Sequence, residues 1–305
     1  MKTIKPKQKK GSASKKSSKS SPAKKKKGVR KPMSSPVLLV PGASATGRDF
    51  LLEKLIEHGQ IVGERVGRKK AVNIAVAAKT TDREQRGAAD RTKICIPAEE
   101  FTKLLDNGDV IADYVLESNG RRYGYGKDAF DADPEADVTV SDASVYQIPA
   151  LKKQLGDRVH TAAMVATRDY RYRNLTARGS ESHEEVLDRL NLGDAHVALL
   201  IMMGGNPTVQ YSEYIDPAIA ALIGGIAMAA REGEERPDLE KALKAICGSD
   251  TVIRMVKELA VDHRQYVDSL VILGERHRVE DPTTPITETQ FFETGVEMIK
   301  KALAL

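Results

Sequence analysis

Residues 37–49 are Val37-Leu38-Leu39-Val40-Pro41-Gly42-Ala43-Ser44-Ala45-Thr46-Gly47-Arg48-Asp49. The first four residues form a short, continuous apolar run, which is typical of a buried parallel strand. A small, glycine-containing segment follows, and after it apolar residues recur at helical spacing at Phe50, Leu51, Leu52, Leu55 and Ile56. The stretch therefore predicts a strand, a glycine loop and a helix in succession.

The segment from Gly42 to Asp49 has the setting of a phosphate-binding loop. The N–H groups of such a loop converge on phosphate oxygens, and the N-terminus of the following helix adds partial positive charge. The glycines have the spacing of the G-x-x-x-x-G-K-[ST] pattern, but Arg48 replaces its lysine and Asp49 replaces its hydroxyl residue. Arginine keeps the positive charge on a larger, forked side chain. We predict that ATP phosphates bind to Gly42, Ala43, Ser44, Ala45, Thr46, Gly47, Arg48 and Asp49; the alternative is an ordinary strand-to-helix turn.

Strands and helices alternate from residue 37 to about residue 190. Further strands are expected at residues 72–78, 110–116, 138–140 and 159–165, and helices at 97–107 and 148–155. This alternation predicts an α/β fold in which a parallel sheet is covered by helices on both faces. The remaining pattern predicts helices at 217–231, 238–246 and 251–261, a last strand at 267–273 and an amphipathic helix at 290–305.

The positive charge of the chain is concentrated in its N-terminal tail. Residues 1–31 hold thirteen lysines and Arg30 without an acidic residue, whereas the remaining residues hold 34 basic and 43 acidic side chains. Residues 1–36 have too few apolar residues to form a core, so we expect a disordered tail with salt-sensitive affinity for nucleic acid or another polyanion. The acidic body argues against a folded nucleic-acid-binding surface.

Several classes of protein are excluded by composition. Cys95 and Cys247 are too few for a disulfide framework and lack metal-ligand spacing, and the six histidines also lack it. No apolar run of about 18 residues is present, so no transmembrane helix is expected. The basic tail is not followed by the apolar segment of a secretory signal, so we expect no such signal. We expect a cytoplasmic protein; the lysine run 24–27 also fits a nuclear localisation signal.

Motifs further along the chain resemble those of the guanylate kinase family, which includes ribose 1,5-bisphosphate phosphokinase. Thr80-Thr81-Asp82-Arg83 with Arg86 is similar to the Thr-Thr-Arg stretch of that family, with the arginine displaced by one residue. Tyr123-Gly124 resembles its Tyr-Gly signature, and residues 178–182 (Arg-Gly-Ser-Glu-Ser) resemble its arginine-containing lid. The resemblance covers about residues 37–192. Residues 196–265 do not resemble any segment of that family.

The resemblance implies an enzyme that transfers the γ-phosphate of ATP, with Mg²⁺, to a small phosphorylated acceptor such as GMP or ribose bisphosphate. It implies four catalytic arginines, Arg48, Arg173, Arg178 and Arg189. It implies an acceptor site formed by Thr81, Arg83, Arg86, Glu117, Tyr123 and Asp142. Magnesium ligation is implied for Asp49 and Asp142.

The resemblance also implies a domain organisation. After the tail comes a core at 37–195, with an acceptor insert at about 80–130 and a lid at about 168–190. A helical insertion at 196–265 separates it from the last strand and helix of the core at 266–305.

The alternative readings of these residues remain open. Arg83 and Arg86 also fit a solvated basic loop, the later arginines fit exposed helix positions, and Tyr123 fits a packed sheet. The family's acceptor-domain tyrosine is missing near Lys93 to Cys95. With Arg48, that departure leaves a second hypothesis: a kinase-like fold that has lost catalysis and serves as a binding module.

Overall fold

The computed structural model describes residues 34–85, 92–117, 119–179, 181–204, 214–262, 264–273 and 288–304. The lysine-rich segment 1–33 is outside the described residues, and so is the predicted acceptor residue Arg86.

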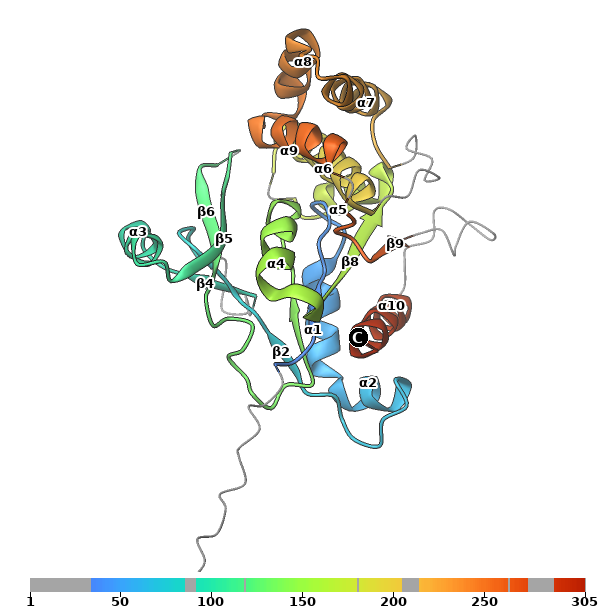
Figure 1. Ribbon diagram of the computed structural model, residues 1–305. Helices are drawn as coiled ribbons and strands as arrows, with labels where there is room; N and C mark the ends of the chain where they lie inside the picture. The colour runs from blue at the N-terminus through green and yellow to red at the C-terminus, as the bar shows by residue number, and fades with distance from the viewer. Residues whose placement is uncertain are drawn as a thin grey trace, which may run out of the picture. The chain divides into compact units, whose positions relative to one another are not determined.

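A five-stranded parallel sheet forms the centre of the body (Figure 1). Its strands, in spatial order, are β2 (Ile74–Val76), β7 (Val138–Ser141), β1 (Val37–Leu39), β8 (Val159–Ala166) and β9 (Ser269–Leu273). In the central register, Leu38 lies between Val140 and His160. Strands β1, β7 and β8 are buried along their whole length, which explains why a continuous apolar run, rather than an alternating pattern, predicted β1.

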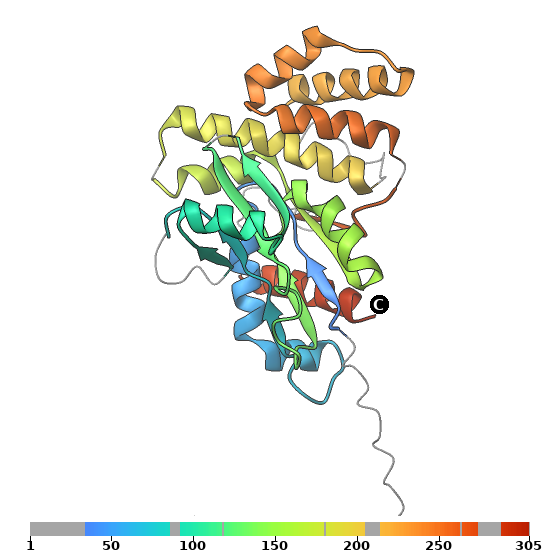
Figure 2. The same ribbon diagram turned by 60° about the vertical axis from the view of Figure 1, so that its left-hand side comes forward.

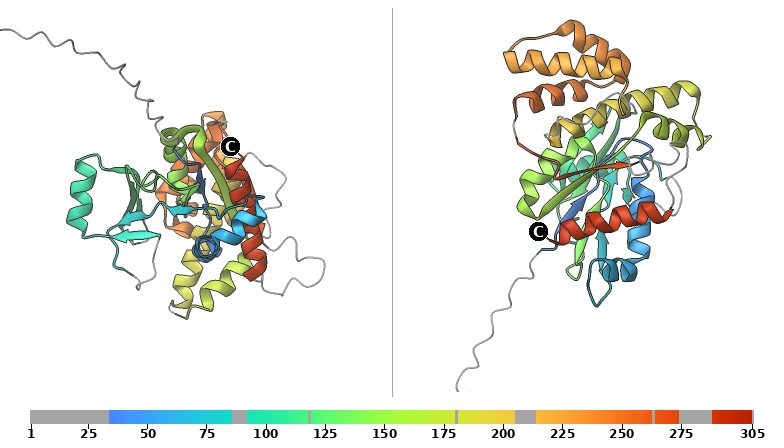
Figure 3. Two further views of the ribbon diagram at one scale, coloured as in Figure 1. Left: turned by 90° about the horizontal axis from the view of Figure 1, so that it is seen from below. Right: turned by 90° about the vertical axis from the view of Figure 1, so that its right-hand side faces the viewer.

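Helices cover both faces of this sheet (Figure 3). On one face, Leu51 and Leu55 of α1 (Arg48–Glu57) pack with Ile299 of α10 (Glu288–Leu303), and α2 (Gly59–Arg65) adds Val62. On the other face, Ile148 of α4 (Ile148–Leu155) packs with residues of β8. Short 3₁₀ turns, η1 (Val145–Gln147) and η2 (Gly156–Arg158), flank α4. The predicted α/β fold, with helices on both faces of a parallel sheet, is confirmed.

A second, mixed sheet lies to one side of the first (Figure 1). Its order is β4 (Lys93–Cys95), β3 (Lys79–Thr81), β6 (Arg121–Gly126) and β5 (Val110–Leu116). Helix α3 (Ala98–Asp106) is held to this sheet by Arg122, whose Nη2 donates to Ala98 O at 2.6 Å and whose guanidinium lies 4.9 Å from the ring of Phe101. The second sheet occupies the range expected for the acceptor insert.

Five helices form the upper part of the body in Figure 2. They are α5 (Arg168–Thr176), α6 (His183–Gly204), α7 (Pro217–Glu232), α8 (Pro237–Cys247) and α9 (Asp250–Val261). Helix α6 runs without interruption through residues 195 and 196, where the sequence suggested a domain boundary. Leu243 and Val256 of the bundle belong to one apolar cluster with Ala163 and Val165 of β8, so the bundle and the sheet share a core. None of the described helices has both the length and the apolarity of a membrane span.

Candidate functional site

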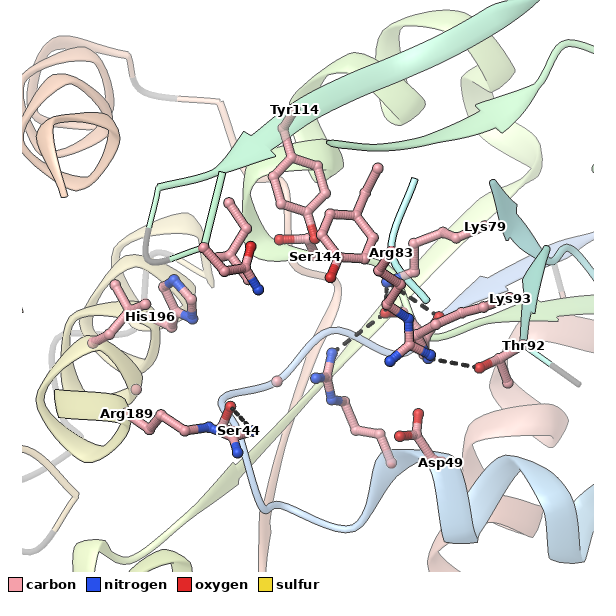
Figure 4. A pocket seen from close by; sticks show the side chains of 18 of the residues that line it. Ser44, Asp49, Lys79, Arg83, Thr92, Lys93, Tyr114, Ser144, Arg189 and His196 are labelled. Atoms are coloured by element: carbon pink, nitrogen blue, oxygen red, sulfur yellow. Dashed lines mark hydrogen bonds and ion pairs between the residues drawn. The ribbon is translucent and has the colours of Figure 1, made fainter. Parts of the chain in front are cut away.

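A cavity of about 840 Å³ lies beside the loop that follows β1. Its walls come from that loop and α1, the second sheet, the end of β7, and α6 (Figure 4). From β1 the chain continues to β2 on one side of the sheet, whereas from β8 it continues to β9 on the other. Ligands of parallel α/β sheets bind at such a switch, outside the carboxyl ends of the strands.

The loop is held in a tight conformation by its own contacts. Gly42 bridges to Met164 of β8, and a Cβ at this position would lie 2.8 Å from the Met164 carbonyl oxygen. Thr46 Oγ1 donates to Ala43 O at 3.0 Å, and Ala45 and Gly47 have φ of 65° and 86°. The amides of Ser44, Ala45 and Gly47 donate to no acceptor within the described residues. Of these three residues, Ser44 lines the cavity, which is where a phosphate-binding loop would present such an amide to an anion.

Arg48 connects the loop to the end of β7. Its Cδ would lie 3.0 Å from a Cβ on Gly42, so the side chain folds back over the loop. Its Nη1 then lies 3.3 Å from the carbonyl oxygens of both Asp142 and Ala143. The guanidinium charge is thus placed beside Asp142.

Asp142 is buried and is surrounded by cations. Lys79 Nζ lies 3.2 Å from Oδ1 and donates to the main-chain oxygen of Asp142 at 2.8 Å, and Lys93 Nζ lies 3.4 Å from Oδ2. Burial would raise the pKa of Asp142, but Lys79, Lys93 and Arg48 hold this pKa below its ordinary value. Burial lowers the pKa of Lys79 to about 8, against the opposing effect of Asp142. Three basic side chains and one carboxylate therefore lie together at the end of β7.

Aromatic side chains also lie at the cavity, among them Tyr114, which is labelled in Figure 4. The rings of Tyr114 and Tyr123 stack with centroids 5.3 Å apart and planes 18° apart. Tyr146 packs 5.5 Å from Tyr114, and its hydroxyl lies 2.7 Å from Nε2 of His196. Burial, with Arg48 and Arg171 nearby, lowers the pKa of His196 to about 3, so this imidazole is neutral. Tyr114, Tyr123 and His196 line the cavity, whereas Tyr146 supports them from behind.

The hairpin of α5 and α6 places two arginines at the cavity. Arg189 is ion-paired with Glu181, and its Nη2 lies 3.4 Å from Ser44 Oγ of the loop. Arg178 also lines the cavity. Within the hairpin, α6 is joined to α5 by Asp194, which is buried and ion-paired with both Arg168 and Arg171. Asn174 of α5 donates from Nδ2 to Ala45 O of the loop at 2.9 Å.

The structure gathers most of the site residues predicted from sequence. Those that line the cavity are Gly42, Ser44, Arg48, Asp49, Arg83, Tyr123, Asp142, Arg178 and Arg189. The other loop residues, Ala43, Ala45, Thr46 and Gly47, shape the turn without lining the cavity.

Outside the loop, three more of the predicted residues that the structure describes do not line the cavity. Thr81 is buried in β3, where its Oγ1 accepts a hydrogen bond from the amide of Arg83 at 3.3 Å. Arg173 is exposed on α5. Glu117 accepts hydrogen bonds from the amide and hydroxyl of Thr251, at 3.0 and 2.6 Å. Glu117 therefore links the second sheet to α9.

The cavity also contains residues that the motifs did not indicate. Lys79, Lys93, Tyr114 and His196 line it. The sequence does contain a signal for Lys79, because it follows the apolar run Val76-Ala77-Ala78. A lysine that continues a buried strand needs a charged partner. No comparable signal is present for Tyr114 or His196.

The surroundings of Asp142 do not fit a magnesium ligand. Mg²⁺ is held by one or two carboxylates together with substrate phosphates, but the Asp142 carboxylate already lies between two ammonium groups. A divalent cation there would be repelled by Lys79, Lys93 and Arg48. Asp49 is exposed on the first turn of α1 and is the remaining predicted ligand. Across the described residues, no group of three or more His, Cys, Asp or Glu side chains is placed to hold a metal.

Comparison with known proteins gives little help. No protein-family model matches the sequence, and no curated protein matches it. Among solved structures, a guanylate kinase from Anaplasma phagocytophilum is similar with a TM-score of 0.37 and 18% identity, covering 54% of this chain and 72% of that chain. A likeness at this level assigns neither family nor function to this chain.

Proposed function

We propose that the protein is a phosphotransferase that moves the γ-phosphoryl group of ATP to a small phosphorylated acceptor, a nucleoside monophosphate such as GMP or a ribose bisphosphate. One observation carries this proposal. The glycine loop with Arg48, Arg83 of the second sheet, and Arg178 and Arg189 of the helical hairpin all face the same cavity. Phosphoryl transfer depends on positioning and charge neutralisation more than on a reactive side chain.

Each part of the cavity has a role in this proposal. The loop amides and Arg48 hold the donor phosphates, and Arg83 holds the acceptor phosphate. Tyr114 and Tyr123 contact the flat part of the acceptor. Arg178 and Arg189 neutralise charge on the transferred group and help to exclude water.

The test is a coupled assay with ATP, MgCl₂ and a panel of nucleoside monophosphates and sugar phosphates. We expect turnover of one acceptor class, and Arg83→Gln should lower kcat/KM by roughly 10- to 100-fold, since a charge-assisted contact contributes about 1.5–3 kcal/mol. Arg65→Gln is the matched control, because Arg65 is an exposed arginine of α2 paired with Glu293. If folded protein turns over none of the acceptors, the phosphotransferase proposal is wrong.

A second candidate function is binding without catalysis. It is favoured by the engagement of Arg48 with the carbonyls of Asp142 and Ala143 and by the pairing of Asp142 with two lysines. A binding module of this kind predicts weak ATP affinity and no gain of activity in Arg48→Lys. Micromolar ATP binding by calorimetry, or activity in Arg48→Lys, would exclude it.

A further inference from the structure

Ala45, in the glycine loop, has a backbone conformation that is unusual for a residue with a side chain. Its φ is 65°, and among the residues that the structure describes Ala112 is the only other non-glycine residue with a positive φ. The Cβ of an L-residue crowds the backbone in this left-handed region, so such a residue persists only where the surrounding structure holds it. Conformations of this kind gather at functional sites, and the preceding residue, Ser44, lines the cavity.

The hairpin of α5 and α6 holds Ala45 in two ways. Asn174, half-buried on α5, donates from Nδ2 to Ala45 O at 2.9 Å, across 129 positions of sequence. Ala45 is also buried in a small apolar cluster with Leu175 of α5 and with Val186 and Leu190 of α6. The conformation of the loop at this residue therefore depends on the hairpin.

The two contacts differ in what they can fix. The packing of a methyl group has no preferred direction, whereas a hydrogen bond weakens steeply when its angle is poor. The bond from Asn174 therefore fixes the direction of the Ala45 carbonyl, and with it the rotation of the peptide plane. The same hairpin contacts the preceding residue, since Arg189 Nη2 lies 3.4 Å from Ser44 Oγ (Figure 4). The part of the loop that faces the cavity is thus placed by side chains of the hairpin.

We propose that Asn174 is a positioning residue for phosphate binding. By holding the carbonyl of Ala45, it keeps the loop in the left-handed turn that places Ser44 at the cavity. Asn174 itself does not line the cavity, so it acts through the loop and not on the ligand. This inference deepens the proposed function and rests on its claim that the loop binds phosphates.

The experiment is calorimetric titration of the full chain with inorganic pyrophosphate. We expect Asn174→Ala to weaken binding by roughly 3- to 10-fold, the effect of losing one neutral hydrogen bond. Thr176→Ala is the matched control on the same helix. Thr176 is exposed, and its hydroxyl donates to the carbonyls of Tyr172 and Arg173 in its own helix, so this variant should bind as the unchanged protein does.

A second titration shows whether Asn174 acts through the conformation of Ala45. Glycine adopts the left-handed conformation without the penalty of a Cβ, so the loop should depend less on Asn174 in a protein that carries Ala45→Gly. Adding Asn174→Ala to that variant should weaken binding by a smaller factor than the same change does in the unchanged protein. An equal factor in both backgrounds would overturn the inference.

Circular dichroism and urea unfolding separate positioning from stability. If Asn174 only stabilises the contact between α5 and the loop, Asn174→Ala unfolds more easily but the folded variant binds pyrophosphate with unchanged affinity, and the inference is wrong. If Asn174→Ala does not fold, Asn174→Ser replaces it, because the serine hydroxyl is one bond shorter than the asparagine amide. Failure of the unchanged protein to bind pyrophosphate also overturns the inference.

The inference and the proposed function can fail separately. Pyrophosphate binding that depends on Asn174, in a protein that transfers no phosphoryl group, supports the inference and removes the proposed function. Phosphoryl transfer from ATP with the same kcat/KM in Asn174→Ala as in the unchanged protein does the reverse.

Discussion

At the scale of single residues, Lys79 shows how burial in the cavity wall changes the protonation of a side chain. Its ammonium group is buried next to Asp142, which follows β7, and near Arg48 of α1 and Lys93 of β4, and burial lowers its pKa to about 8. A bound phosphate favours the protonated lysine. Proton uptake by Lys79 and ligand binding are therefore linked.

The linkage predicts that phosphate affinity falls as the pH rises through about 8, because the ammonium form is lost there. Lys79→Arg keeps its charge at all these pH values and should flatten the profile. Calorimetric titrations with pyrophosphate from about pH 7 to about pH 9 measure the effect. If the affinity of the unchanged protein for pyrophosphate does not vary with pH over this range, the ammonium group of Lys79 does not contribute to phosphate binding.

Gly47 provides a second residue-scale prediction, on stability. Its φ is 86°, and a Cβ would lie 2.9 Å from the ring of Phe291 in α10. Gly67 has a similar φ of 79° with no atom within 4 Å of a Cβ. Both Gly→Ala changes cost the backbone strain of roughly 1–2 kcal/mol, and Gly47→Ala should lose about 1 kcal/mol more through the clash. Equal losses in urea unfolding would show that the Phe291 contact is unimportant.

Asp82 is a residue whose role could not be predicted from the sequence motif alone. Asp82 occupies the place where the resemblance expects an arginine. The structure explains it: Asp82 accepts from Nε of Arg122 at 2.7 Å and from its amide at 2.8 Å. The partner is 40 residues away in sequence, so only the pairing of β3 with β6 could reveal it.

At the scale of elements, the α5–α6 hairpin depends on a buried ion pair. Arg171 and Asp194 are both fully buried, and Arg171 Nη2 also donates to Tyr214 O at 2.7 Å. Asp194→Ala would leave Arg171 uncompensated in the core. This change should lower the free energy of unfolding by roughly 3–5 kcal/mol.

Asp238→Ala is the control for this prediction, because Asp238 pairs with Arg236 at the surface. Its effect on the free energy of unfolding should be much smaller, because an ion pair exposed to solvent contributes little to stability. Chemical denaturation of the two variants gives the comparison. A loss of similar size in both would mean that the buried pair does not anchor the hairpin.

Elements with a clear apolar pattern were predicted within a few residues. Strand β1, helix α4 and the bundle helices α7, α8 and α9 are examples. Strands β3 and β4 were not distinguished from the sequence, since each has three residues and contains a lysine. Helix α2 was also missed. Short elements of this kind are fixed by tertiary pairing rather than by local periodicity.

At the scale of the whole molecule, the bundle and the parallel sheet share one apolar cluster. We therefore expect them to unfold together. Leu243→Ala, at a fully buried position of α8, should cost roughly 2–5 kcal/mol. Helical circular dichroism and the total tyrosine fluorescence should show coincident transitions, whereas separated transitions would indicate an independent bundle.

The division of charge along the chain leads to a separate prediction. Residues 1–31 are strongly basic and the remainder is acidic, so polyanion affinity should depend on the tail alone. Deletion of residues 1–31 should abolish retention on heparin at low salt, and raised salt should release the full chain. Unchanged retention after the deletion would exclude the tail as the contact.

The hydrogen bonds from Thr251 to Glu117 limit how the second sheet can move relative to α9. They tie the β5–β6 hairpin to the start of α9, at 3.0 and 2.6 Å. A swing of the second sheet toward the glycine loop must either break these bonds or pull α9 with it. These two hydrogen bonds therefore couple the position of the second sheet to that of the helical bundle.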